Sequence, residues 1–112
     1  MSNRKVVVMT TSSPFATLNS YEALRLSLGL FDVKVSVLWS GEGVYNAIKG
    51  GDNTLIQPFI RVLPDLDIDL YVDKSDLQEK GLTEAELIRD VKAIEREDVI
   101  QLICEADIVL TF

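Results

Sequence analysis

The clearest pattern in the chain is a set of short apolar runs separated by segments with helical periodicity. The runs that predict strands span residues 5–10, 33–39, 68–72 and 108–112. The first and the last are β-branched and almost continuously apolar, which is typical of strands covered on both faces. In the run 33–39, apolar residues line one face while Lys34 and Ser36 share the other, so we expect this strand to be less evenly buried.

The intervening segments predict helices at about 18–31, 44–49, 55–63, 75–80 and 97–106. Thr17 or Asn19 is expected to cap the first, and 52–54 offers caps for the third, where Pro58 falls near the first turn. Thr83 and Glu86 have the spacing of a capping box. The segment after it has two readings: a helix continuing to Ile94, or a short fourth strand over 91–94.

Strands that alternate with helices at this spacing predict βαβ units. Right-handed crossovers then place helices on both faces of the sheet. The expected fold is a three-layer α/β/α architecture, in which four to five strands form a mostly parallel sheet. The 112 residues fit a single domain over 1–112.

Composition removes several function classes. The net charge of −7 disfavours direct binding of nucleic acid, whose phosphates the chain would repel. The chain has no histidine and one cysteine, which argues against a metal centre and an internal disulfide, and nothing calls for a cofactor. No apolar run approaches the roughly 18 residues needed to span a bilayer, and no secretory signal is evident, so we expect a cytoplasmic protein without membrane contact.

In parallel sheets, ligands bind beyond the carboxyl ends of the strands, so three loops are candidate binding sites. Thr11, Ser12 and Ser13 are suited either to holding an anion or to capping a helix. The segment Gly41-Glu42-Gly43 lacks the third glycine and the lysine of phosphate-binding loops, so it predicts a tight turn. Asp73 and Ser75 form the third candidate loop.

Two further groups of residues have side chains suited to chemistry. Asp73, Asp76 and Glu79 are either magnesium ligands or, as we favour, helix caps and solvated charge. Cys104 is the only candidate nucleophile, but a cysteine between apolar residues of a helix is more often an inert packing residue. We therefore expect Cys104 to be buried and Cys104→Ser to reduce stability.

Four stretches together resemble the DsrE/DsrF/TusC family of small sulfur-relay proteins. They are the opening Val6-Val7-Val8-Met9-Thr10-Thr11-Ser12-Ser13-Pro14, the segment from Val37 to Val44, Tyr71-Val72-Asp73 with Leu77-Gln78-Glu79-Lys80-Gly81-Leu82, and the closing segment from Ala106 to Phe112. The likeness covers nearly the whole length and rests on the order and spacing of the stretches. The third and fourth look most like the TusC/DsrF branch.

The resemblance implies a subunit of a sulfurtransferase complex that passes sulfane sulfur as a cysteine persulfide, for tRNA thiolation or for sulfur oxidation. Active relay members carry the cysteine just after the third strand, and the matching position here is Asp73 or its neighbour. A carboxylate does not carry sulfane sulfur, so the resemblance implies a non-catalytic subunit, in a homo- or hetero-oligomer with other DsrE-like chains. The alternative is a stand-alone oligomeric protein of the same fold that binds a small ligand.

The sequence also predicts an apolar and an acidic contact surface. The first helix has more apolar residues than one sheet face needs, namely Leu18, Leu24, Leu26, Leu28, Leu30 and Phe31. Such excess is typical of an interface, so we expect oligomers. Asp73, Asp76 and Glu79 are expected to form a negative contact surface, so that Asp73→Lys slows partner binding without disturbing the fold.

Overall fold

A computed structural model describes residues 4–13, 18–30, 32–50 and 56–112. They contain one sheet of five parallel strands in the order β4-β3-β2-β1-β5. The strands are β1 (Lys5–Thr10), β2 (Lys34–Trp39), β3 (Asp69–Asp73), β4 (Val91–Ile94) and β5 (Ile108–Thr111). The α/β fold with a mostly parallel sheet is thus confirmed, and every neighbouring pair runs parallel.

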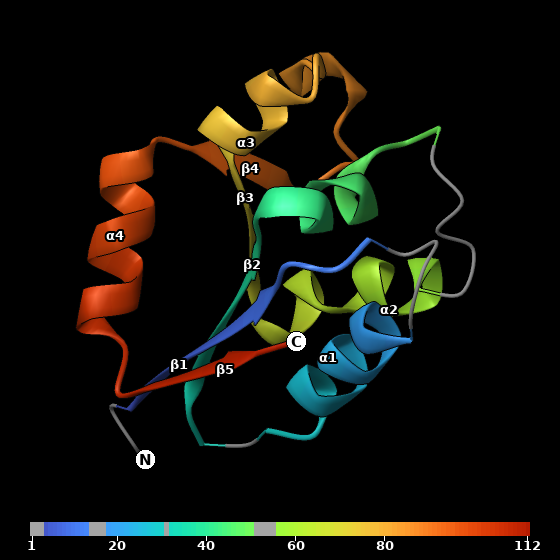
Figure 1. The fold of residues 1–112 in the computed structure, drawn as a ribbon. Coiled ribbons are helices and arrows are strands. Elements are labelled where there is room, and N and C mark those ends of the chain that lie inside the picture. Colours follow the sequence, from blue (N-terminus) through green and yellow to red (C-terminus); the bar gives the residue numbers. More distant parts are fainter. Residues whose placement is uncertain (1–3, 14–17, 31, 51–55) are drawn as a thin grey trace.

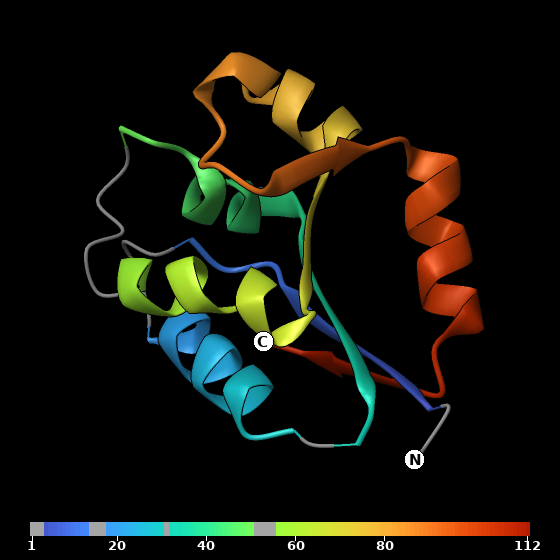
Figure 2. The same ribbon diagram turned by 180° about the vertical axis from the view of Figure 1, so that it is seen from behind.

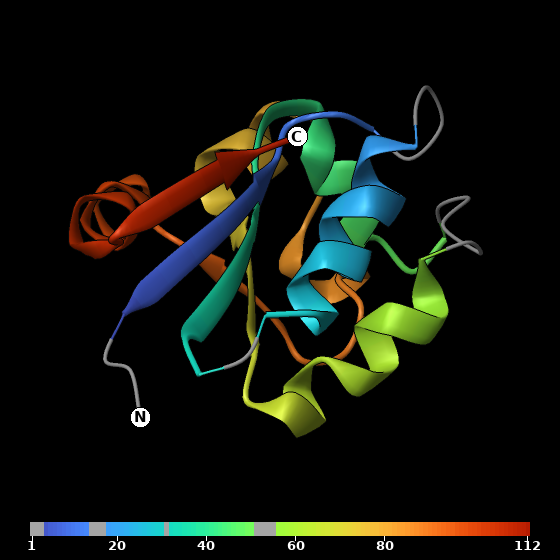
Figure 3. The same ribbon diagram turned by 90° about the horizontal axis from the view of Figure 1, so that it is seen from below.

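Helices cover both faces of the sheet and complete the three layers (Figures 1 and 2). The α-helices are α1 (Asn19–Leu28), α2 (Gln57–Val62), α3 (Lys74–Glu79) and α4 (Arg96–Glu105). Figure 3 shows α4 on one face, with α1 and α2 on the other. Short 3-10 helices fill the connections: η1 (Gly41–Ala47), η2 (Pro64–Leu66) and η3 (Glu84–Glu86).

The core lies mainly between the sheet and α1. Alternate residues of β1 and β2, such as Val8 and Val37, are fully buried on this face, where they pack with Leu24 of α1. The opposite face carries a smaller cluster in which Val7 and Leu38 pack with Val99 of α4. The β-branched composition of β1 suits this environment, because side chains of a central parallel strand are enclosed on both faces.

The first two helical segments differ from the sequence-based expectation in type and ends. Leu18 precedes α1 without a side-chain cap, and Asn19 is the first helical residue. Thr17, Phe31 and the expected caps at 52–54 lie outside the described residues. The segment expected as a helix at 44–49 is the 3-10 helix η1, which begins earlier, at Gly41.

Of the two structures expected after Thr83, a helix continuing to Ile94 or a strand over 91–94, the strand is the one present. Thr83 N donates to the Glu86 carboxylate at 2.8 Å, as a capping box requires, but only the short η3 follows. The chain then reaches β4, which pairs with β3 through Leu70 and Val91. Pro58 lies in the first turn of α2, as expected.

The prediction that the closing strand is buried is wrong. β5 is an edge strand that pairs only with β1 among the described strands, and Ile108 and Val109 are 45% and 36% exposed. An edge strand has one neighbour instead of two, so its side chains lack enclosure on one side. Among the described residues, no helix is long and apolar enough to cross a membrane.

Candidate functional site

The loops that follow β1, β2 and β3 meet at the carboxyl edge of the sheet, as parallel strands require. The backbone joins them: Ser40 N donates to Thr10 O at 3.1 Å, next to the Thr10–Trp39 pair that ends the β1–β2 ladder. β2 pairs in turn with β3, for example through Leu38 and Tyr71, and β3 ends at Asp73. Nearly all the candidate binding residues therefore lie at one edge.

Asp73 is the most constrained of these residues. It is 2% exposed and caps α3, where its Oδ1 accepts hydrogen bonds from Ser75 N at 2.9 Å and Asp76 N at 3.3 Å. Its Oδ2 lies 2.9 Å from Nε of Arg96, the first residue of α4. These three partners satisfy the hydrogen-bonding capacity of the buried carboxylate, so its role in this chain is to hold β3, α3 and α4 together.

Asp76 extends this network to the loop after β2. One oxygen, Oδ2, accepts from Gly41 N at 2.8 Å, and the other, Oδ1, lies 3.2 Å from Nη2 of Arg96. Arg96 therefore bridges two carboxylates of the β3–α3 junction, although about half of its side chain is exposed. The expectation of a negative surface from Asp73, Asp76 and Glu79 needs correction, because Asp73 is buried and the first two are paired with Arg96.

The loop after β2 passes so close to β1 that only glycine fits at position 43. A Cβ on Gly43 would lie 2.8 Å from the carbonyl carbon of Thr10. Next to this contact, Nδ2 of the buried Asn46 donates to Gly43 O at 2.8 Å and to Ser12 O at 3.1 Å. Gly41 has a φ of +54°, which glycine adopts without strain. The segment expected as a tight turn is instead the start of the 3-10 helix η1, and it serves a close approach of two backbones.

The hydroxyl loop after β1 is tied down by several hydrogen bonds. Thr11 N donates to Phe112 O at 3.0 Å, and Thr11 Oγ1 reaches the same oxygen at 3.4 Å. Ser12 O also accepts from Ser20 Oγ at 3.3 Å, at the start of α1. These contacts hold the loop in place, but α1 has no side-chain cap, so the helix-capping reading of the loop is not confirmed. Thr11 is exposed and Ser13 is half-buried, whereas the continuation of the loop at 14–17 lies outside the described residues.

Two buried polar atoms below these loops lack partners. Among the described residues, Thr10 Oγ1 and Trp39 Nε1 are buried without a hydrogen bond. They belong to paired positions at the ends of β1 and β2 and lie on the same face of the sheet, that of α1. A buried polar atom without a partner is unfavourable, so these two positions weaken the carboxyl end of this face.

Several ion pairs lie on the exposed surface of the carboxyl edge. Lys74 Nζ lies 3.2 Å from Glu95 Oε1 and 4.0 Å from Glu84 Oε2, and the hydrogen bond to Glu95 is the main reason why the pKa of Lys74 is raised. Lys80 approaches Glu42 at 4.0 Å. Within the described ranges, no group of three or more acidic or cysteine side chains is arranged to hold a metal ion.

Cys104 does not meet the expectation of a buried packing residue. It is exposed and lies near the end of α4. Ile100 of the same helix is also exposed, at 55%. Val99 is buried, and Leu102, Ile103 and Ala106 contact the core, which is the i, i+3, i+4, i+7 stripe of one helix face. Cys104 lies off that stripe. Since α4 leads directly into β5, Cys104 is at the amino edge of the sheet, away from Asp73.

Sequence reasoning missed two residues of this edge. Arg96 was not singled out because it lies 23 positions after Asp73, and no local pattern connects them. Its position at the start of α4 is a weak signal, because a cation at a helix N-terminus is unfavourable unless it has another partner. Asn46 gave a similar signal as a polar residue within the apolar segment 44–48.

Comparisons with known proteins agree with this architecture. Residues 4–112 match the model of the DsrE/DsrF-like family. The intracellular sulfur oxidation protein DsrF of Allochromatium vinosum is 29% identical, with 97% of this chain and 96% of that protein covered. The TusC homolog of Pseudomonas aeruginosa is 26% identical, with 97% of this chain and 98% of that protein covered.

A solved structure supports the fold independently. The crystal structure of the ychN protein from E. coli superposes with a TM-score of 0.84 at 21% identity, covering 99% of this chain and 100% of that one. At this identity the likeness shows the fold alone. With the family match over 4–112 and relatives from the DsrF and TusC branch, the chain belongs to the DsrE/DsrF-like family.

Proposed function

We propose that this chain is a supporting subunit of a sulfur-relay complex and does not itself carry sulfur. The observation that carries the proposal is Asp73. It stands at the end of β3, at or next to the position expected for the cysteine of relay members, neither of its neighbours is a cysteine, and its carboxylate is buried under Arg96. A relay cysteine must be accessible as a thiolate. The residue at this position is neither a thiol nor accessible.

Cys104 is a poor substitute for a relay cysteine. It is exposed, but it belongs to the last turn of α4, at the edge of the sheet opposite Asp73. An unpaired exposed thiol does fit a reducing, intracellular compartment, which agrees with a cytoplasmic location.

Exposed apolar residues support an assembly with other DsrE-like chains, although fewer than the sequence suggested. Leu24 of α1 is fully buried, whereas Leu18 and Leu26 are 63% and 37% exposed. The edge strand β5 adds Ile108 and Val109. Apolar residues in such numbers on a small domain are typical of a partner surface. Light scattering should therefore show a complex, and a strict monomer at tens of micromolar would contradict this part of the proposal.

Sulfur loading tests the supporting role directly. In a relay step, the acceptor thiolate attacks the outer sulfur of a donor persulfide, the donor S–S bond breaks, and the donor leaves as a thiolate. The donor is a cysteine desulfurase charged with ³⁵S-cysteine. We expect no label on the wild-type chain, or on Cys104→Ser. Label on the wild type that Cys104→Ser removes would make this chain a carrier and overturn the proposal.

A second experiment identifies the assembly. The tagged chain is isolated from its native cells and its companions are identified by mass spectrometry. We expect a DsrE-like chain that carries a cysteine directly after its third strand. Mixing that companion with this chain should then allow the companion, and not this chain, to become labelled.

A further inference from the structure

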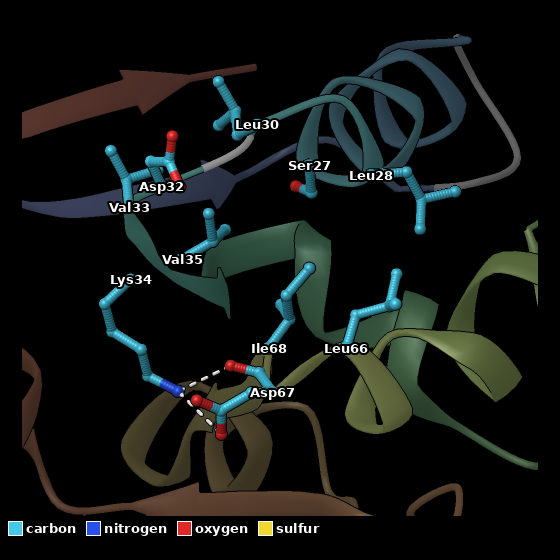
Figure 4. Close-up of a pocket in the computed structure, with 10 residues that line it drawn as sticks. All are labelled: Ser27, Leu28, Leu30, Asp32, Val33, Lys34, Val35, Leu66, Asp67 and Ile68. Atoms are coloured by element: carbon cyan, nitrogen blue, oxygen red, sulfur yellow. Dashed lines mark hydrogen bonds and ion pairs between the residues drawn. The ribbon is translucent and has the colours of Figure 1, made fainter. Parts of the chain in front are cut away.

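A cavity of about 410 Å³ opens at the amino edge of the sheet, opposite the candidate site. It lies between the end of α1, the first residues of β2, and η2 with the residues that lead into β3 (Figure 4). Leu28 of α1 lies on one side, and Leu66 of η2 and Ile68 lie on the other. The volume falls within the usual range of binding pockets, about 300–1,000 Å³.

The walls of this cavity are mostly aliphatic. Val35 and Ile68 form a buried floor, with 2% and 7% exposure, whereas Leu66 on the wall is 56% exposed. Covering this leucine and the concave apolar surface beside it with another apolar group is favourable, because it removes apolar area from water. The cavity therefore suits one apolar side chain.

The rim of the cavity is acidic. Asp32 and Asp67 are both exposed at the opening, and Lys34 is the cation among the lining residues. Lys34 is already engaged: Nζ donates to Asp67 O at 2.6 Å and lies 3.4 Å from Asp67 Oδ1 and 3.2 Å from Asp69 Oδ2. The rim thus has carboxylate charge that its lysine does not neutralise.

This negative charge continues along the same edge. A second hollow shares Asp67 and Ile68 with the first and is also lined by Asp69, Asp90 and Lys92. The acidic residues do not converge on a point, because no cluster of three suited to a metal occurs in the part of the chain that the structure describes. A distributed negative rim around an apolar hollow favours an extended basic ligand over a metal ion.

We propose that this cavity is a docking site for a basic segment of a partner protein, which inserts one aliphatic side chain flanked by lysine or arginine. The side chain covers Leu66 and Ile68, and the flanking cations approach Asp32 and Asp67. A second copy of this chain complements this rim poorly, because it would bring a chain of net charge −7 against exposed carboxylates. The site lies at the other edge from Asp73, so both edges are available to partners simultaneously.

A titration of the ¹⁵N-labelled chain followed by NMR tests the proposal. The probe is a blocked peptide, Gly-Lys-Leu-Lys-Gly, at low salt. We expect saturable shifts of the amides of Leu28, Leu66 and Ile68. Leu66→Ser should weaken binding about tenfold, because it removes the exposed apolar wall. Ile100→Ser, which removes an equally exposed residue from α4, is the matched control and should leave binding unchanged.

A second set of variants tests the contribution of the rim carboxylates to peptide binding. Asp32→Asn and Asp67→Asn remove the rim charge, and asparagine tolerates their positive φ values of 61° and 60°. Together they should weaken binding several-fold at low salt and less at high salt. Asp90→Asn, at a φ of 72° in the second hollow and outside the first cavity, measures how far the rim contributes and should have a smaller effect.

Four results would overturn the proposal. The first is the absence of saturable shifts, and the second is equal binding of Gly-Glu-Leu-Glu-Gly. Shifts of the same amides on simple concentration of the free protein would identify a second copy as the occupant. Equal binding of n-butylammonium would indicate a site for a small amphipathic cation.

Discussion

Oδ2 of Asp73 and Nε of Arg96 lie 2.9 Å apart and join the end of β3 to the start of α4. The carboxylate is buried and the guanidinium is half-exposed, so the pair connects the core to the surface at the carboxyl edge of the sheet. The contact therefore contributes to the stability of the fold. The earlier expectation that Asp73→Lys leaves the fold intact is therefore abandoned, because a buried lysine would face Arg96 and lose the cap of α3.

The first prediction concerns the strength of this pair. A double-mutant cycle with Asp73→Asn and Arg96→Gln should give a coupling free energy of about 1–2 kcal/mol, measured by urea unfolding. Asparagine preserves the cap of α3, so the cycle isolates the ion pair. The control cycle is Lys74→Gln with Glu95→Gln, a pair at 3.2 Å whose carboxylate is 60% exposed, which should give less than about 0.5 kcal/mol. Equal coupling in the two cycles would contradict the structural role of Asp73.

The second prediction concerns the close approach between η1 and β1. Gly43→Ala should destabilise the protein by about 1–3 kcal/mol or more, because its methyl group would collide with the Thr10 backbone. Gly50→Ala is the control, since nothing lies within 4 Å of a Cβ there. Thermal unfolding of the two variants decides the matter. If Gly43→Ala is as stable as Gly50→Ala, the two backbones are farther apart than described.

The third prediction concerns the unpartnered hydroxyl of Thr10. Thr10→Val keeps the shape of the side chain and removes a buried polar atom without a partner, so it should be neutral or stabilising by up to about 1 kcal/mol. Val8→Thr introduces a hydroxyl at the preceding buried position on the same face of β1, and should cost about 1–3 kcal/mol. A loss of stability in Thr10→Val would reveal a hydrogen bond or bound water at Oγ1.

The sequence was informative where structure depends on local pattern. The strand Lys5–Thr10 appears at its expected residues, since an uninterrupted β-branched run has few alternatives to a central strand. The same argument failed for Ile108–Thr111. A run of apolar residues does not distinguish a central strand from an edge strand, because strand order depends on contacts far apart in the sequence.

In the candidate site, too, features set by local pattern and topology were predictable, whereas contacts between distant residues were not. Because the carboxyl ends of parallel strands share one edge, topology alone predicted that the three loops meet. The partner of Asp73 was not predictable, since Arg96 comes from another element. The exposure of Cys104 was readable in principle: Val99, Leu102, Ile103 and Ala106 already define the buried stripe of α4, and Cys104 does not belong to it.

The fourth prediction concerns alkaline pH and Tyr71 of β3. Burial is the main cause that raises the pKa of Tyr71 above 10.0, and the charge of Asp69 and its hydrogen bond to the phenol at 3.3 Å add to it. A raised pKa in the folded state means that the folded protein holds this proton more tightly than the unfolded chain does. The stabilisation is fully present below the unfolded pKa of about 10 and is lost as the pH rises through the folded value.

Unfolding experiments between pH 8 and pH 11.5 should therefore show a loss of stability above about pH 10 that is shallower in Tyr71→Phe. Lys74, whose pKa is also raised, contributes in the same direction, so the variant removes only part of the loss. The difference in tyrosinate absorbance between wild type and Tyr71→Phe should have its midpoint above 10.0. Asp69→Asn should lower that midpoint only partly, because burial remains. A midpoint at or below 10.0 would show that Tyr71 is more open to water than described.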